Sequence, residues 1–135
     1  MSINPPFAVI VDAYSTGRYL AKEFGKAGFN FLGIHSNANE GLEDSRKYFQ
    51  NSKLDIPVIQ DGHSKIADEY KAFKTPHVFI VSPKLEILFQ GGIDNSKMAH
   101  KADRFYLKDA LTAIRNGNPL TEKNVRVLGC EIKRP

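Results

Sequence analysis

The clearest structural signal in the sequence lies in residues 74–90, Lys74-Thr-Pro-His-Val-Phe-Ile-Val-Ser-Pro-Lys-Leu-Glu-Ile-Leu-Phe-Gln90. Residues 77–81 are rich in β-branched and aromatic side chains, and residues 86–90 contain the apolar run Ile87-Leu-Phe89, so both segments predict strands. Ser82-Pro-Lys-Leu85 between them contains residue types that favour a turn. The stretch therefore predicts an antiparallel β-hairpin that is preceded directly by Thr75-Pro76 and ended by Gly91-Gly92.

A strand-helix-strand pattern opens the chain. Residues 7–11 form a short apolar run that predicts a buried strand. Residues 19–24 have helical spacing, with Ser15 or Thr16 as the expected N-cap, and residues 29–34 predict a second strand. Two strands joined through one helix predict a right-handed parallel βαβ unit.

The remaining segments complete an α/β pattern. We expect helices over 42–51, 64–73 and 103–115, a short extended piece at 56–59, and a tail at 125–130 that adds an edge strand or packs as an extension. Ile66, Ala67, Tyr70 and Phe73 make the apolar stripe of the second of these helices. The pattern predicts a mixed sheet with helices on both faces, in a single domain over residues 1–135.

Composition and charge exclude several classes of protein. The chain has 135 residues, of which 41% are hydrophobic and 25% charged, so it can bury a core. The net charge is +4, but the basic residues after Lys97 are scattered among acidic ones without an aromatic pattern, which argues against a nucleic-acid surface. The sequence contains neither a run of about 20 apolar residues nor a signal-peptide pattern, so we expect a cytoplasmic protein without a membrane partner.

The element order and the position of Thr75-Pro76 resemble the thioredoxin fold, in which this bond is cis and lies beside the redox site. Residues 29–134 are similar to redoxins of the peroxiredoxin-like AhpC/TSA family. The similarity is carried by Phe31-Leu-Gly-Ile-His-Ser-Asn37, Thr75-Pro-His-Val-Phe-Ile-Val81, Phe89-Gln-Gly-Gly-Ile-Asp94 and Gly129-Cys-Glu-Ile-Lys133. It implies a three-layer thioredoxin-like fold with a mixed sheet, a βαβ unit, a hairpin and a C-terminal helix.

The sequence departs from that family where the reaction should occur. The resemblance implies a Cys-Pro or Cys-x-x-Cys motif at the start of the first helix, where the helix N-terminus lowers the pKa of a thiol. The corresponding segment is Asp12-Ala-Tyr-Ser-Thr-Gly-Arg18, which contains no cysteine. A serine hydroxyl is far less acidic than a thiol, and no base is evident beside it. We therefore expect the ordinary redoxin reaction to be absent from this position.

The start of the chain has a different resemblance. Residues 8–24 resemble the opening strand, turn and helix of ATP-grasp ligases, whose nucleotide site lies mainly in later domains. The chain thus has the pattern of a hybrid or chimera, with an ATP-grasp-like start over 7–28 and a redoxin-like body over 29–134. Natural recombination and deliberate construction both remain open as its origin.

Two sets of residues are candidates for a site. The polar turn formed by Tyr14, Ser15, Thr16, Gly17 and Arg18 precedes the first helix, where an anion or another ligand can bind, although an ordinary N-cap explains the same residues. We expect a groove between this turn and the segment before the hairpin, and Thr75, Pro76 and His77 lie on the other side of that groove. Cys130 is the only thiol; it is a catalytic candidate if a nearby cation activates it, and otherwise an inert residue.

These residues leave several functions open. The first hypothesis is a redox-inactive binding or scaffold module that takes a peptide or protein partner in the groove beside Thr75-Pro76. The alternative is a one-cysteine thiol oxidoreductase or peroxidase that uses Cys130, and a weaker alternative is a nucleotide-binding remnant. The four histidines lack ligand spacing and there is no thiolate cluster, so we expect no metal and no cofactor. A homodimer is left open.

Overall fold

The computed structural model describes residues 7–11, 18–36, 57–95 and 101–133. In chain order the elements are β1 (Phe7–Val11), α1 (Arg18–Gly25), β2 (Asn30–His35), β3 (Val58–Gln60), α3 (Lys65–Glu69), β4 (Lys74–Thr75), β5 (His77–Val81), β6 (Ile87–Gly91), α4 (Tyr106–Arg115) and β7 (Cys130–Glu131). The helix predicted over 42–51 lies outside the described residues.

Five strands form one mixed sheet in the order β3-β2-β1-β5-β6. β1 is parallel to β2, with Val9 opposite Leu32, and β2 is parallel to β3. β5 is antiparallel to both β1 and β6. The parallel β1-α1-β2 pair and the β5-β6 hairpin were both predicted from the sequence, and both predictions are confirmed. β4 and β7 pair separately as an antiparallel two-stranded sheet.

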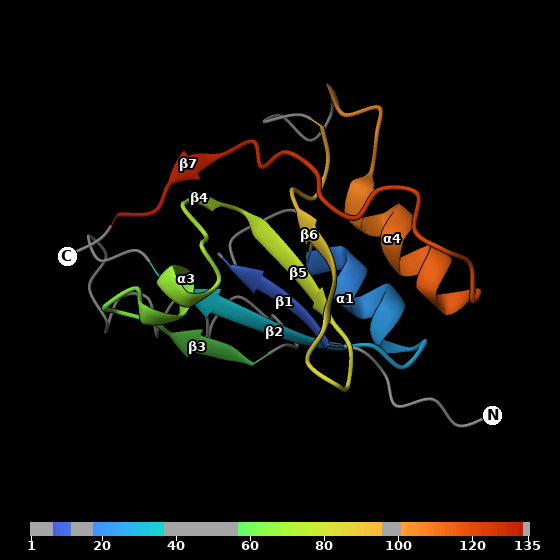
Figure 1. Cartoon of the computed structure of the whole chain (residues 1–135), viewed down its shortest axis with the longest axis horizontal. Helices are drawn as coiled ribbons and strands as arrows, with labels where there is room; N and C mark the ends of the chain where they lie inside the picture. Colours follow the sequence, from blue (N-terminus) through green and yellow to red (C-terminus); the bar gives the residue numbers. More distant parts are fainter. Residues whose placement is uncertain (1–6, 12–17, 37–56, 96–100, 134–135) are drawn as a thin grey trace.

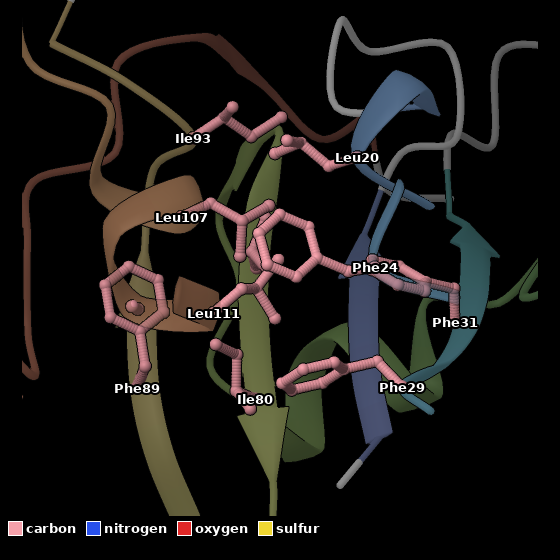
Figure 2. Packing of buried hydrophobic residues seen from close by; sticks show 11 residues of the cluster. Leu20, Phe24, Phe29, Phe31, Ile80, Phe89, Ile93, Leu107 and Leu111 are labelled. Carbon is pink, nitrogen blue, oxygen red and sulfur yellow. The ribbon is translucent and has the colours of Figure 1, made fainter. Parts of the chain in front are cut away.

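The helices cover both faces of the sheet, as predicted. α1 and α4 lie on one face and α3 lies on the other (Figure 1). Figure 2 shows the larger core, in which Leu20 and Phe24 of α1 and Leu107 and Leu111 of α4 pack with Ile80 of β5. Side chains alternate across a strand, so β5 contributes to both cores.

The second core lies between the sheet and α3. Phe79 and Val81 of β5 pack there with Ala67 of α3 and with Ile132 from the C-terminal tail. All five residues of β5 are buried. A strand that is buried on both faces needs a nearly continuous apolar sequence, which explains why this stretch carried such a clear strand signal.

The second predicted helix is shorter than expected. It was predicted over 64–73, but α3 ends at Glu69, and Lys71 has a left-handed backbone with φ 56°. Phe73, which was expected in the apolar stripe, is 61% exposed. The reason is tertiary: the Phe73 carbonyl accepts a hydrogen bond of 2.9 Å from the backbone of Ile132, so this segment pairs with the tail instead of continuing the helix.

The last helix begins later than predicted, at Tyr106 instead of 103. The side-chain oxygen of Asn95 accepts hydrogen bonds of 3.1 Å from the amides of Asp103 and Arg104, which holds these residues outside the helix.

The tail forms an ordered extension and also adds a strand: Asn124 makes a parallel bridge to Gln90, and β7 follows. Within the described ranges, no helix is both long enough and apolar enough to cross a bilayer.

Candidate functional site

The candidate site lies where the end of β1 meets the start of β5. Val11, the last residue of β1, is opposite His77, the first residue of β5. The chain leaves β1 at Val11 and enters α1 at Arg18. Thr75, Pro76 and His77 therefore lie at the end of the sheet from which the chain passes to the first helix.

Thr75 and Pro76 lead directly into β5. The peptide bond between them is cis, and Thr75 is buried. Through β4, Thr75 pairs with Cys130 of β7. The tail lies so close that a Cβ atom placed on Gly129 would be 1.7 Å from the Thr75 carbonyl oxygen. Only glycine fits such an approach of two backbones without a shift.

His77 is a buried polar residue in this apolar surrounding. Its ring stacks on Phe79, with a distance of 4.2 Å between the ring centroids and an angle of 21° between the planes. Burial lowers the pKa of His77, and a hydrogen bond with the Gln90 side chain opposes that effect in part. His77 is thus held as a neutral imidazole, which has one hydrogen-bond donor and one acceptor.

Gln90 is a residue of the site that sequence reasoning did not single out. It lies in β6 opposite Phe79, and this register brings its side chain to His77 on the neighbouring strand. The sequence signal for Gln90 was one polar side chain directly after the apolar run 87–89. Its partner depends on the hairpin register, which the residue pattern alone did not specify.

The structure brings together only part of the residues predicted for the site. Thr75, Pro76 and His77 are contiguous, and the backbone of Cys130 lies opposite Thr75. Arg18 is the first residue of α1. Tyr14, Ser15, Thr16 and Gly17 lie outside the described residues, so the binding role of that turn stays a prediction.

A second polar cluster, also not predicted, lies at the carboxyl ends of β2 and β3. The Asp61 carboxylate accepts hydrogen bonds from the Ser36 hydroxyl at 2.9 Å and from the amides of Ile66 at 3.2 Å and Ala67 at 3.1 Å. The Ser64 hydroxyl donates to the Ser36 carbonyl at 2.9 Å. These bonds satisfy free amides at the start of α3, so the cluster has a structural role. Over the described part of the chain, no group of three or more His, Cys, Asp or Glu residues has the arrangement of a metal site.

The model of the AhpC/TSA family matches residues 14–90. This match covers more than half of the chain and includes α1, β2 and the whole hairpin apart from its last residue. The chain belongs to the AhpC/TSA family. The matched region begins within residues 8–24, the segment that resembles ATP-grasp ligases, and the chimeric origin inferred from that resemblance stays a prediction.

Solved structures agree with this family in fold. A hypothetical protein from Sinorhizobium meliloti, SMc02350, is 21% identical, with 98% of this chain and 81% of that chain covered and a TM-score of 0.83. An uncharacterized conserved protein from Geobacillus kaustophilus is also 21% identical, with 98% and 79% covered and a TM-score of 0.84. A putative thioredoxin from Neisseria meningitidis is 16% identical, with 84% and 77% covered and a TM-score of 0.55. No curated protein matches the chain. The AhpC/TSA protein described here therefore has the predicted thioredoxin-like fold.

Proposed function

We propose that this AhpC/TSA-family protein is a binding module that retains a thioredoxin-like frame without the family's redox reaction. The segment between β1 and α1, residues 12–17, and the first helical residue, Arg18, contain no cysteine. A helix-start thiolate is the nucleophile that this family's chemistry requires, and an alcohol does not replace it at neutral pH. What remains at this end of the sheet is a surface for binding.

The ligand we propose is an extended peptide segment that binds beside Thr75 and Pro76. The observation that supports it is the pairing of β4, the strand that contains Thr75, with another extended segment, β7. Backbone groups of such a strand provide affinity through main-chain hydrogen bonds, and neighbouring side chains provide selectivity. His77, with its neutral imidazole next to Pro76, is the polar group we propose to select among ligands.

Selection of displayed heptapeptides against the full chain tests this function. We expect enriched peptides that shift the backbone amide signals of Lys74, Thr75 and His77 in NMR spectra of the labelled protein. The signals of Lys84 and Leu85 at the hairpin turn serve as the internal control, since Leu85 is 82% exposed and distant in the register. Peptides whose binding shifts only signals elsewhere, or a failure to enrich any peptide, would contradict the proposal.

The second candidate function is a one-cysteine thiol peroxidase, and it rests on the position of Cys130 opposite Thr75. In this reaction the Cys130 thiolate attacks one oxygen of hydrogen peroxide, the O–O bond breaks, and hydroxide leaves to become water. The cysteine is then a sulfenic acid, which an external thiol reduces by forming a mixed disulfide and a second water. A second external thiol regenerates Cys130 by disulfide exchange.

Intact-mass spectrometry after brief exposure to limiting peroxide distinguishes the two candidates. For a binding module we expect no rapid gain of oxygen and no adduct with a sulfenic-acid trap. Rapid stoichiometric oxidation, together with peroxide turnover that is lost in Cys130→Ser, would favour the peroxidase and overturn the redox-inactive function.

A further inference from the structure

The C-terminal tail returns after α4 and is attached at two places, once to the five-stranded sheet and once to β4, which lies outside that sheet (Figure 1). The first attachment is at β6. The backbone amide of Gln90 donates to the Lys123 carbonyl at 2.7 Å, and the amide of Val125 donates to the Gln90 carbonyl at 3.0 Å. Gly91 permits this contact, because a Cβ atom there would lie 2.3 Å from the Val125 carbonyl oxygen.

The second attachment is at β4, close to the end of the chain. Lys74 pairs with Glu131 and Thr75 with Cys130, and the Ile132 amide donates to the Phe73 carbonyl at 2.9 Å. The Ile132 side chain is 5% exposed and packs in the core between α3 and the sheet. We call the main-chain edge of residues 73–75 the β4 edge and residues 129–132 the tail strand.

The tail strand has the features of a peptide ligand. It is extended, it pairs by backbone hydrogen bonds, it carries glycine where two backbones meet, and it inserts one branched apolar side chain into a buried site. Strand addition to an exposed edge uses these same interactions. The tail strand differs from a free ligand in being tethered, which gives it an effective concentration on the order of millimolar.

The two attachments of the tail lie several residues apart along the chain. Local opening of a few residues costs less free energy than unfolding of the whole domain. The attachment at Gln90 lies earlier in the chain, so the tail strand can detach from β4 while Lys123 and Val125 remain paired.

We propose that the tail strand is a built-in competitor for the β4 edge, so that an extended peptide from another protein binds beside Pro76 only when the tail strand detaches. The inference rests on the proposed function, since it concerns the ligand class of the same site. It adds a sequence preference: the peptide carries a small residue at the position of Gly129 and a branched apolar residue three positions later, at the position of Ile132.

The test compares full-length variants for binding of one fluorescent probe. The probe is a peptide with the sequence of residues 127–133 in which serine replaces the cysteine, so that it forms no disulfide. Gly129→Ala places a Cβ atom against the Thr75 carbonyl and detaches the tail strand, while Ile132→Ala removes its apolar anchor. Gly62→Ala is the matched control, because a Cβ atom there has nothing within 4 Å.

We expect Gly129→Ala and Ile132→Ala to bind the probe at least about tenfold more tightly than the wild type and Gly62→Ala. A second probe with aspartate at the isoleucine position should lose this gain. Circular dichroism checks whether each variant remains folded. Because the two variants detach the tail strand by different causes, the test still holds if one of them unfolds.

Equal affinity of all four proteins for the probe, or no binding by any of them, would overturn the competitor proposal. Selection of displayed heptapeptides against the wild type then distinguishes failure of the competitor proposal from failure of the proposed function. If displayed heptapeptides still bind the wild type at Lys74 and His77, the binding function stands without the competitor. If they do not, both proposals fail.

Discussion

His77 is a titratable side chain in a strand whose other residues are apolar and buried. Its ring is stacked on Phe79 and hydrogen-bonded to Gln90, so the buried polar ring keeps a hydrogen-bond partner. Burial removes water from the ring and disfavours the charged form, which lowers its pKa. The residue next to Pro76 therefore contributes a hydrogen-bonding group without a charge at neutral pH.

We expect protonation of His77 to lower the free energy of unfolding in acid. The pKa of His77 is lowered below its ordinary value of 6.5, so the unfolded chain binds more protons as pH falls through that value. The free energy of unfolding therefore decreases from pH about 6.5 down through the folded pKa. Urea unfolding of the wild type and His77→Gln across this range measures the effect, and the wild type should lose more stability than the variant.

His63→Gln is the matched control for that experiment, because His63 is exposed. Its stability should follow the wild-type curve as pH falls. Parallel pH curves for the wild type and His77→Gln would mean that protonation of His77 is not coupled to unfolding.

At the scale of single elements, α3 is a helix that needs external support. It spans only Lys65–Glu69, which is too short to be stable by its own hydrogen bonds. Asp61 provides that support, because its carboxylate accepts bonds from two amides at the start of the helix and from Ser36. The short helix is thus attached to the carboxyl ends of β2 and β3.

We expect Asp61→Ala to lower the free energy of unfolding by about 1–3 kcal/mol, because it leaves buried donors without an acceptor. Hydrogen exchange at the amides of Ile66 and Ala67 should become faster. Glu69→Ala, an exposed change in the same helix, is the control and should have little effect. Unchanged exchange at these two amides in Asp61→Ala would show that the carboxylate does not hold the helix.

At the scale of the whole molecule, two cores share one strand. Val78 and Ile80 pack on the side of α1 and α4, whereas Phe79 and Val81 pack on the side of α3. Because neighbouring residues of β5 belong to different cores, loss of packing on one face displaces the backbone that supports the other. The two cores should therefore unfold together.

We expect Ile80→Val and Phe79→Leu each to lower stability by about 1 kcal/mol and to retain a single unfolding transition. NMR signals of Leu111 in one core and Ala67 in the other should disappear at the same urea concentration. Leu85→Ala, at an 82% exposed position, is the control with little expected effect. Two separated transitions would show that the cores unfold independently.

Features that depend on local residue pattern could be predicted before the fold was known. Strand-forming residues and turn residues predicted the hairpin. The parallel β1-α1-β2 unit was predicted from two apolar runs with a helical stripe between them. Thr75, Pro76 and His77 became candidate site residues through the resemblance to the thioredoxin fold, which Thr75-Pro76 carries by its place directly before the hairpin. The missing thiol at the first helix also needs no structure, since it is a property of residue type.

Contacts that join distant segments could not be predicted from the residue pattern, because the fold sets them. The backbone of Phe73 pairs with Ile132, and α3 ends before it reaches Phe73. The Asn95 side chain binds the amides of Asp103 and Arg104, so α4 starts after them. The hydrogen bond of His77 to Gln90 depends on hairpin register, and the close contact at Gly129 depends on the path of the tail. Each of these is a hydrogen bond or a backbone contact between segments that the fold brings together, and such partners leave no local periodic signal in the chain.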